Sequence, residues 1–221
     1  MSTIRVLQIF EDVQTVLQDT IGIRWPNKEL LAWFNAARLA VVNHRPDACT
    51  QGVLFTPQPG TRQELPPEAL SLIDVTRNES AASWRAIKNG QKDWLDDQIP
   101  DWHNPANSAD EVEMYMYNPK TPKEFYIYPG ATEQTKFRMT ISVAPPAIVL
   151  SNYTSDDTTI GIDDTYANAI TDFILSRCYQ KAVKYAERLE RSQMHDHKFN
   201  NALGIKTQSD MAITPTPSDN V

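Results

Sequence analysis

Long apolar runs, glycines, cysteines and basic clusters are all scarce in this sequence of 221 residues. It contains no stretch of about 18 apolar residues, so we expect no membrane-spanning segment. The N-terminus opens an amphipathic pattern where a secretory signal would have a charged region and an apolar run, so we expect no signal peptide either. The two cysteines, Cys49 and Cys178, lie far apart in the sequence. We interpret both as reduced, with Cys178 on the buried stripe of a helix.

The missing motifs also limit the chemistry. Seven glycines leave little room for phosphate-binding loops, and there is no Cys-x-x-Cys pair, nucleophile elbow or His-Glu-x-x-His motif. A net charge of −7 without a basic run argues against tight wrapping of DNA. We therefore predict no enzyme, no cofactor and no metal site.

Two acidic pairs and one histidine pair could be exceptions. Asp96-Asp97 and Asp163-Asp164 could supply an acid and a base, but adjacent acids usually cap helices or face water. His195 and His197 stand two residues apart in a helical pattern, where side chains point about 200° away from each other. They are therefore not expected to share a metal ion.

Aromatic residues are concentrated in the middle of the chain. Trp84, Trp94 and Trp102, with tyrosines nearby, could form a stacking surface for single-stranded nucleic acid. Such a surface needs interleaved lysines or arginines, whereas this neighbourhood is acidic, with residues such as Asp93 and Glu111. We favour packing in a core or an interface.

The spacing of apolar residues predicts three helices. The first spans about residues 3–20, with Ser2 or Thr3 as its cap, and the second spans 27–44, with Asn27 as its cap. The third is predicted as one long helix over 165–203, preceded by a capping aspartate at position 163 or 164. Its core stripe comprises Tyr166, Ile170, Ile174, Cys178, Ala182, Tyr185 and Leu189.

Two segments predict β-structure. Residues 52–66 contain two short runs around a Pro-rich turn, which indicates a hairpin arm. Residues 111–144 contain three runs that alternate apolar and polar residues with period two, which indicates an antiparallel meander with one buried face. We therefore expect an α+β, mainly helical fold, in which a helical bundle with a long C-terminal helix carries this β insertion. Residues 1–203 would form one domain.

The chain ends in a polar segment, Gly204–Val221, which is too poor in large apolar residues to form a core of its own. We expect this segment to be an extended tail that a partner holds. Its main apolar side chains, Ile205, Met211 and Ile213, are the candidate contacts with that partner. The predicted long helix would exceed what one core needs, so part of it is expected to pack against a neighbouring subunit.

A serial order of short motifs over most of the chain resembles the head-to-tail adaptor proteins of tailed bacteriophages. The motifs are Trp25-Pro26, Glu29-Leu30, Trp33-Phe34-Asn35, Arg45-Pro46-Asp47-Ala48, Leu65-Pro66, Arg77-Asn78, Pro100-Asp101-Trp102, residues 122–129, residues 166–170 and residues 199–204.

This resemblance implies a structural protein of the virion. Such adaptors assemble, commonly as twelve copies, into a ring that joins the portal ring to the tail nozzle or tube and continues the DNA channel. Double-stranded DNA passes through the channel without specific binding. The protein would lie at the neck after assembly in the host cytoplasm, and its C-terminal segment, with Ile205, Met211 and Ile213, would bind the portal.

Two alternatives stay open from the sequence. One is a tail-associated cell-wall hydrolase that works through a carboxylate pair. The other is a different connector of the same particle, such as a head-completion or tail-tube protein.

Overall fold

The computed structural model describes residues 2–79, 84–182 and 186–213, with the backbone alone described at position 186 and over 205–213. The chain forms two compact units, which we describe separately. Unit 1 consists of Met1–Ala48 and Pro145–Val221, and unit 2 consists of Cys49–Ala144.

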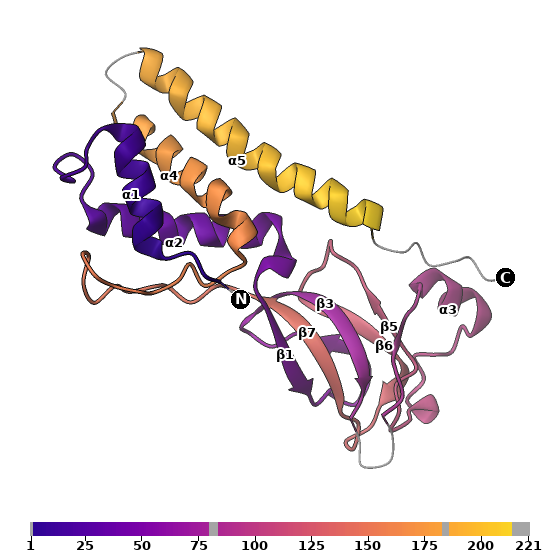
Figure 1. Ribbon diagram of the computed structural model, residues 1–221. Helices are drawn as coiled ribbons and strands as arrows, with labels where there is room; N and C mark the ends of the chain where they lie inside the picture. Colours follow the sequence, from indigo (N-terminus) through magenta and orange to yellow (C-terminus); the bar gives the residue numbers. More distant parts are fainter. Residues whose placement is uncertain (1, 80–83, 183–185, 214–221) are drawn as a thin grey trace. The chain divides into compact units, whose positions relative to one another are not determined.

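Unit 1 is helical. Its longest helix, α5, runs beside α4, and α4 in turn packs against α1 and α2 (Figure 1). The four helices of this unit are α1 (Val6–Leu17), α2 (Asn27–His44), α4 (Ala167–Lys181) and α5 (Ala186–Ile213).

The core of unit 1 forms where α4 meets the other three helices. The α4 residues Ile170, Ile174 and Cys178 are fully buried. Phe10 of α1 and Phe34 of α2 meet edge to face in the same core, with ring centroids 6.1 Å apart. Burial of such side chains is the main favourable contribution to folding.

A carboxylate ties the N-terminal residues to the start of α4. Asp164 accepts hydrogen bonds from the Ser2 hydroxyl at 3.0 Å and from the Thr3 hydroxyl at 2.6 Å, and also from the amides of Thr3 and Ile4. The predicted cap by Ser2 or Thr3 is therefore wrong, because both hydroxyls are bound to this carboxylate. Arg5 occupies the N-cap position of α1 and makes no side-chain cap bond. Asp163 does cap the turn before α4, by accepting from the Thr165 amide at 2.9 Å.

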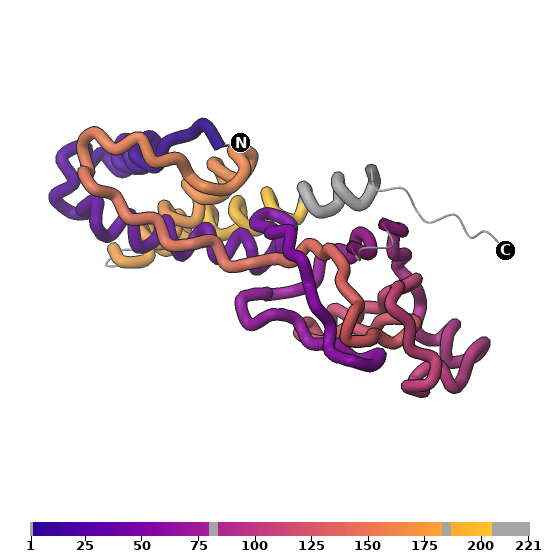
Figure 2. Tube along the Cα trace, turned by 90° about the horizontal axis from the view of Figure 1, so that it is seen from below, coloured from indigo at the N-terminus to yellow at the C-terminus, as the bar shows by residue number. Residues whose placement is uncertain are grey.

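Residues 146–153 run alongside α2 (Figure 2), and Thr158 and Ile160 then bond to the backbone of Val6 and Ile4. Asn35 donates to the carbonyl oxygen of Ile148 at 3.0 Å and accepts from its amide at 2.9 Å. The buried guanidinium of Arg38 donates to the carbonyl oxygen of Pro146 at 2.8 Å. A long loop without regular structure is thereby held by side chains of a helix, which satisfies its backbone groups.

Unit 2 is built on two β-sheets. The first sheet has the strand order β1-β7-β3 and the second has the order β2-β6-β5-β4. All neighbours are antiparallel except β4 and β5. The strands are β1 (Thr50–Phe55), β2 (Gly60–Glu64), β3 (Ala69–Asn78), β4 (Lys88–Asn89), β5 (Met114–Tyr117), β6 (Glu124–Ala131) and β7 (Phe137–Val143).

The two sheets enclose the main core of unit 2. Phe125 and Ile127 of β6 face Phe137 and Met139 of β7 in this core, and all four are fully buried. On the other side of the second sheet, α3 (Lys92–Gln98) covers a smaller cluster of Leu95, Trp102 and Met116.

The structure corrects the expected fold class. Two sheets of three and four strands stand beside the helical unit, so the mainly helical bundle with a β insertion is wrong and the fold is α+β. The expected hairpin over 52–66 is also wrong, because β1 and β2 pair with β7 and β6 in different sheets. Only β5 and β6 pair as the meander predicts, since β7 belongs to the first sheet. Period-two patterns identify strands but leave their partners open.

The long helix predicted over 165–203 is two helices. The α4 helix ends at Lys181, and α5 begins at Ala186 and runs back along α4 (Figure 1). No glycine or proline lies between Lys181 and Ala186, and the apolar spacing continues through this stretch. The sequence therefore gives no signal that one helix ends and another begins. Tyr185 of the predicted stripe lies outside the described residues, and Leu189 is exposed. The expected extended tail is wrong as far as Ile213, because α5 continues to that residue; residues 214–221 lie outside the described part.

We expect the Asp164→Asn variant to lower the thermal midpoint of unit 1 at neutral pH. Hydrogen bonds from Thr3, and to a lesser extent from Ile4 and Ser2, lower the pKa of Asp164 from 3.8 to about 2. A group with a depressed folded-state pKa stabilises the fold above its unfolded pKa, and this contribution is lost as the pH falls through the folded pKa. The difference between the variant and the parent should therefore shrink between pH 4 and pH 2, as measured by circular dichroism melts.

Asp157→Asn is the matched control. Asp157 is bonded to Arg5 at 3.2 Å, but its side chain is 88% exposed, so its removal should change little. An Asp164→Asn difference that stayed constant from pH 7 to pH 2 would contradict this account of the N-terminal tie.

Candidate interaction surfaces

A buried polar seam joins α4 to α5. The Nδ1 atom of His195 lies 2.7 Å from a carboxylate oxygen of Asp172, and the imidazole stacks on the ring of Tyr179 at a centroid distance of 5.6 Å. One turn away, the Ser192 hydroxyl donates to the carbonyl oxygen of Ser176 at 3.1 Å. His195 and Ser192 are both buried. These bonds fix the rotation of α5 about its own axis relative to α4, because any other rotation would leave these polar groups buried without partners.

The seam determines which face of α5 is free. Phe199 and Leu203 continue the buried row toward the C-terminus, and the Phe199 ring meets Phe173 of α4 edge to face at 5.3 Å. Leu189 and Met194 lie on other faces of the helix and are 44% and 45% exposed. Met194 lies on the face of α5 that points away from α4, whereas Leu189 lies on the flank beside Ser176 and Gln180. The face at Met194 is a candidate surface for a neighbouring molecule.

The predicted portal contacts lie at the end of the same helix. Ile205, Met211 and Ile213 all fall within α5, but the structure describes only their backbone. Their role in binding stays a prediction. The seam holds the earlier turns of α5 against α4, so the direction of the helix axis leading to these residues is fixed.

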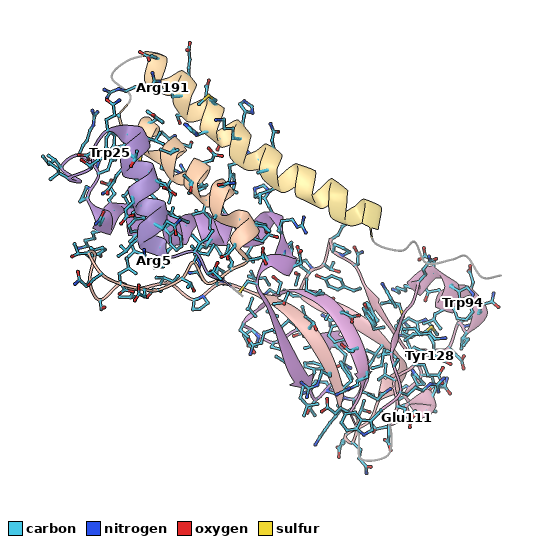
Figure 3. The ribbon with its side chains drawn as sticks, viewed as in Figure 1. Arg5, Trp25, Trp94, Glu111, Tyr128 and Arg191 are labelled. Carbon is cyan, nitrogen blue, oxygen red and sulfur yellow. The ribbon has the colours of Figure 1, made fainter. Side chains whose placement is uncertain are left out.

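A groove of about 570 Å³ opens in unit 1 beside the start of α5. Its lining includes Arg24, Arg188 and Arg191 together with Asp19 and Glu187. Trp25 and Arg191 lie at this end of the unit (Figure 3). The lining also includes Trp25, and tryptophan and arginine are enriched where one protein surface meets another.

The loop beside this groove is held by Asp19. Its carboxylate accepts from the amides of Ile23, Arg24 and Trp25 at 2.9–3.1 Å, and these bonds, that from Trp25 foremost, lower the pKa of Asp19. Ile21 and Ile23 of the same loop are 83% and 81% exposed. Two fully solvated isoleucines on an ordered loop are a further candidate contact.

The acidic pairs have structural partners. Asp163 caps a turn and Asp164 holds the N-terminus, as described above. Asp96 accepts from the indole nitrogen of Trp102 at 2.8 Å, which fixes a buried tryptophan under α3. These bonds account for three of the four carboxylates without catalysis.

The two histidines of the pair lie on different sides of α5. His195 is buried against Asp172, whereas His197 points to solvent on the other side of α5. No group of three or more metal-ligating side chains occurs among the described residues. Burial raises the pKa of the Cys178 thiol to about 12, which keeps it protonated, and neither cysteine forms a disulfide.

The three tryptophans of the middle segment have different environments. Trp102 is buried in a core, while Trp84 and Trp94 are 62% and 52% exposed. The Arg77 guanidinium lies over the Trp84 ring at 4.5 Å. Residues 93–113 carry seven carboxylates and no lysine or arginine. Trp94 and Glu111, both in this segment, are labelled in Figure 3.

Several residues that carry the resemblance are structural ties. Asn35 holds residues 145–163, and Arg45 makes a two-pronged ion pair with Asp47 at 2.9 and 2.7 Å. The fully buried Asn78 donates to the carbonyl oxygen of Val112 at 2.8 Å and accepts from its amide at 2.9 Å. The motifs therefore mark positions that hold each unit together.

These observations define an α+β protein of two compact units. The residues of its motifs bond one element to another, and its candidate functional sites are surfaces for binding other molecules. Among the described helices, none is long and apolar enough to cross a lipid bilayer. The model of the SU10 adaptor protein family matches residues 4–218, and the chain belongs to that family. The resemblance to phage head-to-tail adaptors is thereby confirmed. No curated protein matches the chain.

His195→Ala should destabilise the protein by roughly 1–3 kcal/mol, because it leaves the carboxylate of Asp172 and the stacking face of Tyr179 without their partner. Urea unfolding followed by helical circular dichroism measures this change. His197→Ala, two residues away on the exposed side, should stay within about 0.5 kcal/mol. Equal effects of the two substitutions would show that the seam does not fix α5.

Proposed function

We propose that this chain is a structural head-to-tail adaptor whose copies form a ring between the portal and the tail at the virion neck. Family membership over residues 4–218 carries the proposal, because the match includes both units and the whole of α5. Twelve copies are the expected number, and the ring would continue the channel through which the genome leaves. No turnover is assigned to the protein.

Ring formation requires two different, complementary surfaces on each copy. Unit 1 offers the outward face of α5 at Met194, and separately the groove lined by Arg24, Arg188 and Arg191. These are distinct patches with different chemistry, as a head-to-tail contact demands. Residues 1–203 act in this proposal as one adaptor body.

The portal contact is assigned to the end of α5 and the residues that follow. Ile205, Met211 and Ile213 are the main apolar side chains in a polar stretch of sequence, and a helix that docks on a partner is anchored there by its apolar side chains. Support comes from the seam, which holds the preceding turns of the helix against α4.

Passage of DNA needs a wall that does not bind phosphates. The net charge of −7 and the run of seven carboxylates over residues 93–113 supply a repulsive field. Double-stranded DNA is therefore a passing molecule in this proposal and not a specific ligand.

Replacing Ile205, Met211 and Ile213 together by serine should abolish co-sedimentation with purified portal rings while the thermal midpoint changes little. Truncation after Gly204 should have the same effect on portal binding. The matched control replaces the polar neighbours Thr207, Gln208 and Ser209 by alanine, which should leave binding intact. Undiminished portal binding by the serine variant or by the truncated chain would overturn the assignment.

A further inference from the structure

The groove of unit 1 has a positive lining whose own carboxylates are already bonded. Arg24, Arg188 and Arg191 line it, and the last two stand in the first two turns of α5, where the helix end carries partial positive charge. Of the two lining carboxylates, Asp19 accepts from three backbone amides and Glu187 pairs with Arg191 at 2.6 Å. The groove therefore presents net positive charge to an incoming group.

The same groove contains a hydrogen-bond donor without an acceptor. Trp25 lines the groove and is 6% exposed, and its indole nitrogen has no hydrogen-bond partner in the described part of the chain. A buried donor that lacks an acceptor is unfavourable. The Arg24 guanidinium lies over the Trp25 ring at 4.8 Å, so a cation and an indole stand together here. These features favour an occupant that carries negatively charged oxygen atoms.

An exposed tryptophan stands among carboxylates on α3 of unit 2. Trp94 is 52% exposed, and Asp93 and Asp97 of the same short helix are also exposed. Asp97 lies in the last turn of α3, which contains no basic side chain. A carboxylate is unfavourable there, because the C-terminal end of a helix carries partial negative charge. The patch of Trp94, Asp93 and Asp97 therefore favours a cationic partner.

We propose that the patch of Trp94, Asp93 and Asp97 on one copy of the chain docks in the groove of unit 1 on the next copy. The inference rests on the proposed ring and names the surface that this groove meets. The carboxylates pair with the groove arginines, and the Trp94 ring packs against a guanidinium plane. The groove volume of about 570 Å³ lies in the range that accepts an occupant larger than one side chain.

Charge complementarity points to a second copy as the occupant. One chain carries both halves of the contact, with opposite charge and on different units. Each copy then gives its patch to one neighbour and its groove to another, which is the heterologous kind of contact that closes rings. The contact uses two of the seven carboxylates over residues 93–113, so the others remain for the channel wall.

The test is a charge exchange between copies of the full chain, read by native mass spectrometry as the number of copies on purified portal rings. Asp97→Arg and Arg24→Glu each set like charges against each other, so the concentration that fills the ring should rise about tenfold or more. An equal mixture of the two variants should fill the ring as the parent does, because each changed patch meets a changed groove. Both positions are exposed, so the thermal midpoints should stay close to that of the parent. Glu133→Arg makes the same change of charge at an exposed position outside the patch and should behave as the parent.

The outcomes separate this contact from the adaptor function. Parent-like filling by both single variants, or losses that the mixture does not restore, would overturn the contact and leave the adaptor function standing. Restoration by the double variant Arg24→Glu/Asp97→Arg but not by the mixture would assign the patch to the groove of its own chain. A loss with Asp97→Arg alone would assign the patch to a different partner, and an equal loss with Glu133→Arg would reduce the effect to net charge. A parent chain that does not join the portal would refute the adaptor function itself.

Discussion

The polar seam between α4 and α5 is the constraint on which the functional surfaces of unit 1 depend. Apolar helix faces tolerate small rotations, whereas the contact of His195 with Asp172 and that of Ser192 with Ser176 have one geometry. The seam therefore sets the rotation of α5 about its axis. It decides that Phe199 and Leu203 are inside and that Leu189 and Met194 are outside.

The two units present different kinds of surface to other molecules. Unit 1 presents a long helix whose inner face is bonded and whose far end carries the assigned portal contact. Unit 2 presents sheet edges that differ: β2 and β3 have register irregularities, whereas β1 pairs regularly with β7 in the described residues.

Local signals in the sequence predicted local structure well. The apolar spacing after Trp25-Pro26 predicted a helix over 27–44, and α2 spans Asn27–His44; its predicted cap by Asn27 is wrong, because Pro26 occupies the N-cap position and no side chain caps the helix. The turn before α4 has its predicted cap in Asp163. Such features depend on neighbours a few residues apart, which a sequence displays directly.

Features that depend on distant residues were missed. The partners of β1 and β2 lie 60 residues or more away in different sheets. The type of β3 stayed open between a short helix and a strand over residues 70–75, because its three irregularities disturb the period of two. The break between α4 and α5 has no glycine or proline to signal it. The buried row on α5 begins with Ser192 and His195, which a sequence pattern assigns to the surface because they are polar. Their burial is possible because Ser176 and Asp172 of α4 bond to them. The portal contacts came from the resemblance and from composition.

An image of the full chain bound to purified portal rings tests the central claim most directly. The account predicts a closed ring of copies in which the end of α5, from residue 205 onward, contacts the portal surface. A ring whose α5 ends point away from the portal, or single copies bound through unit 2, would contradict it.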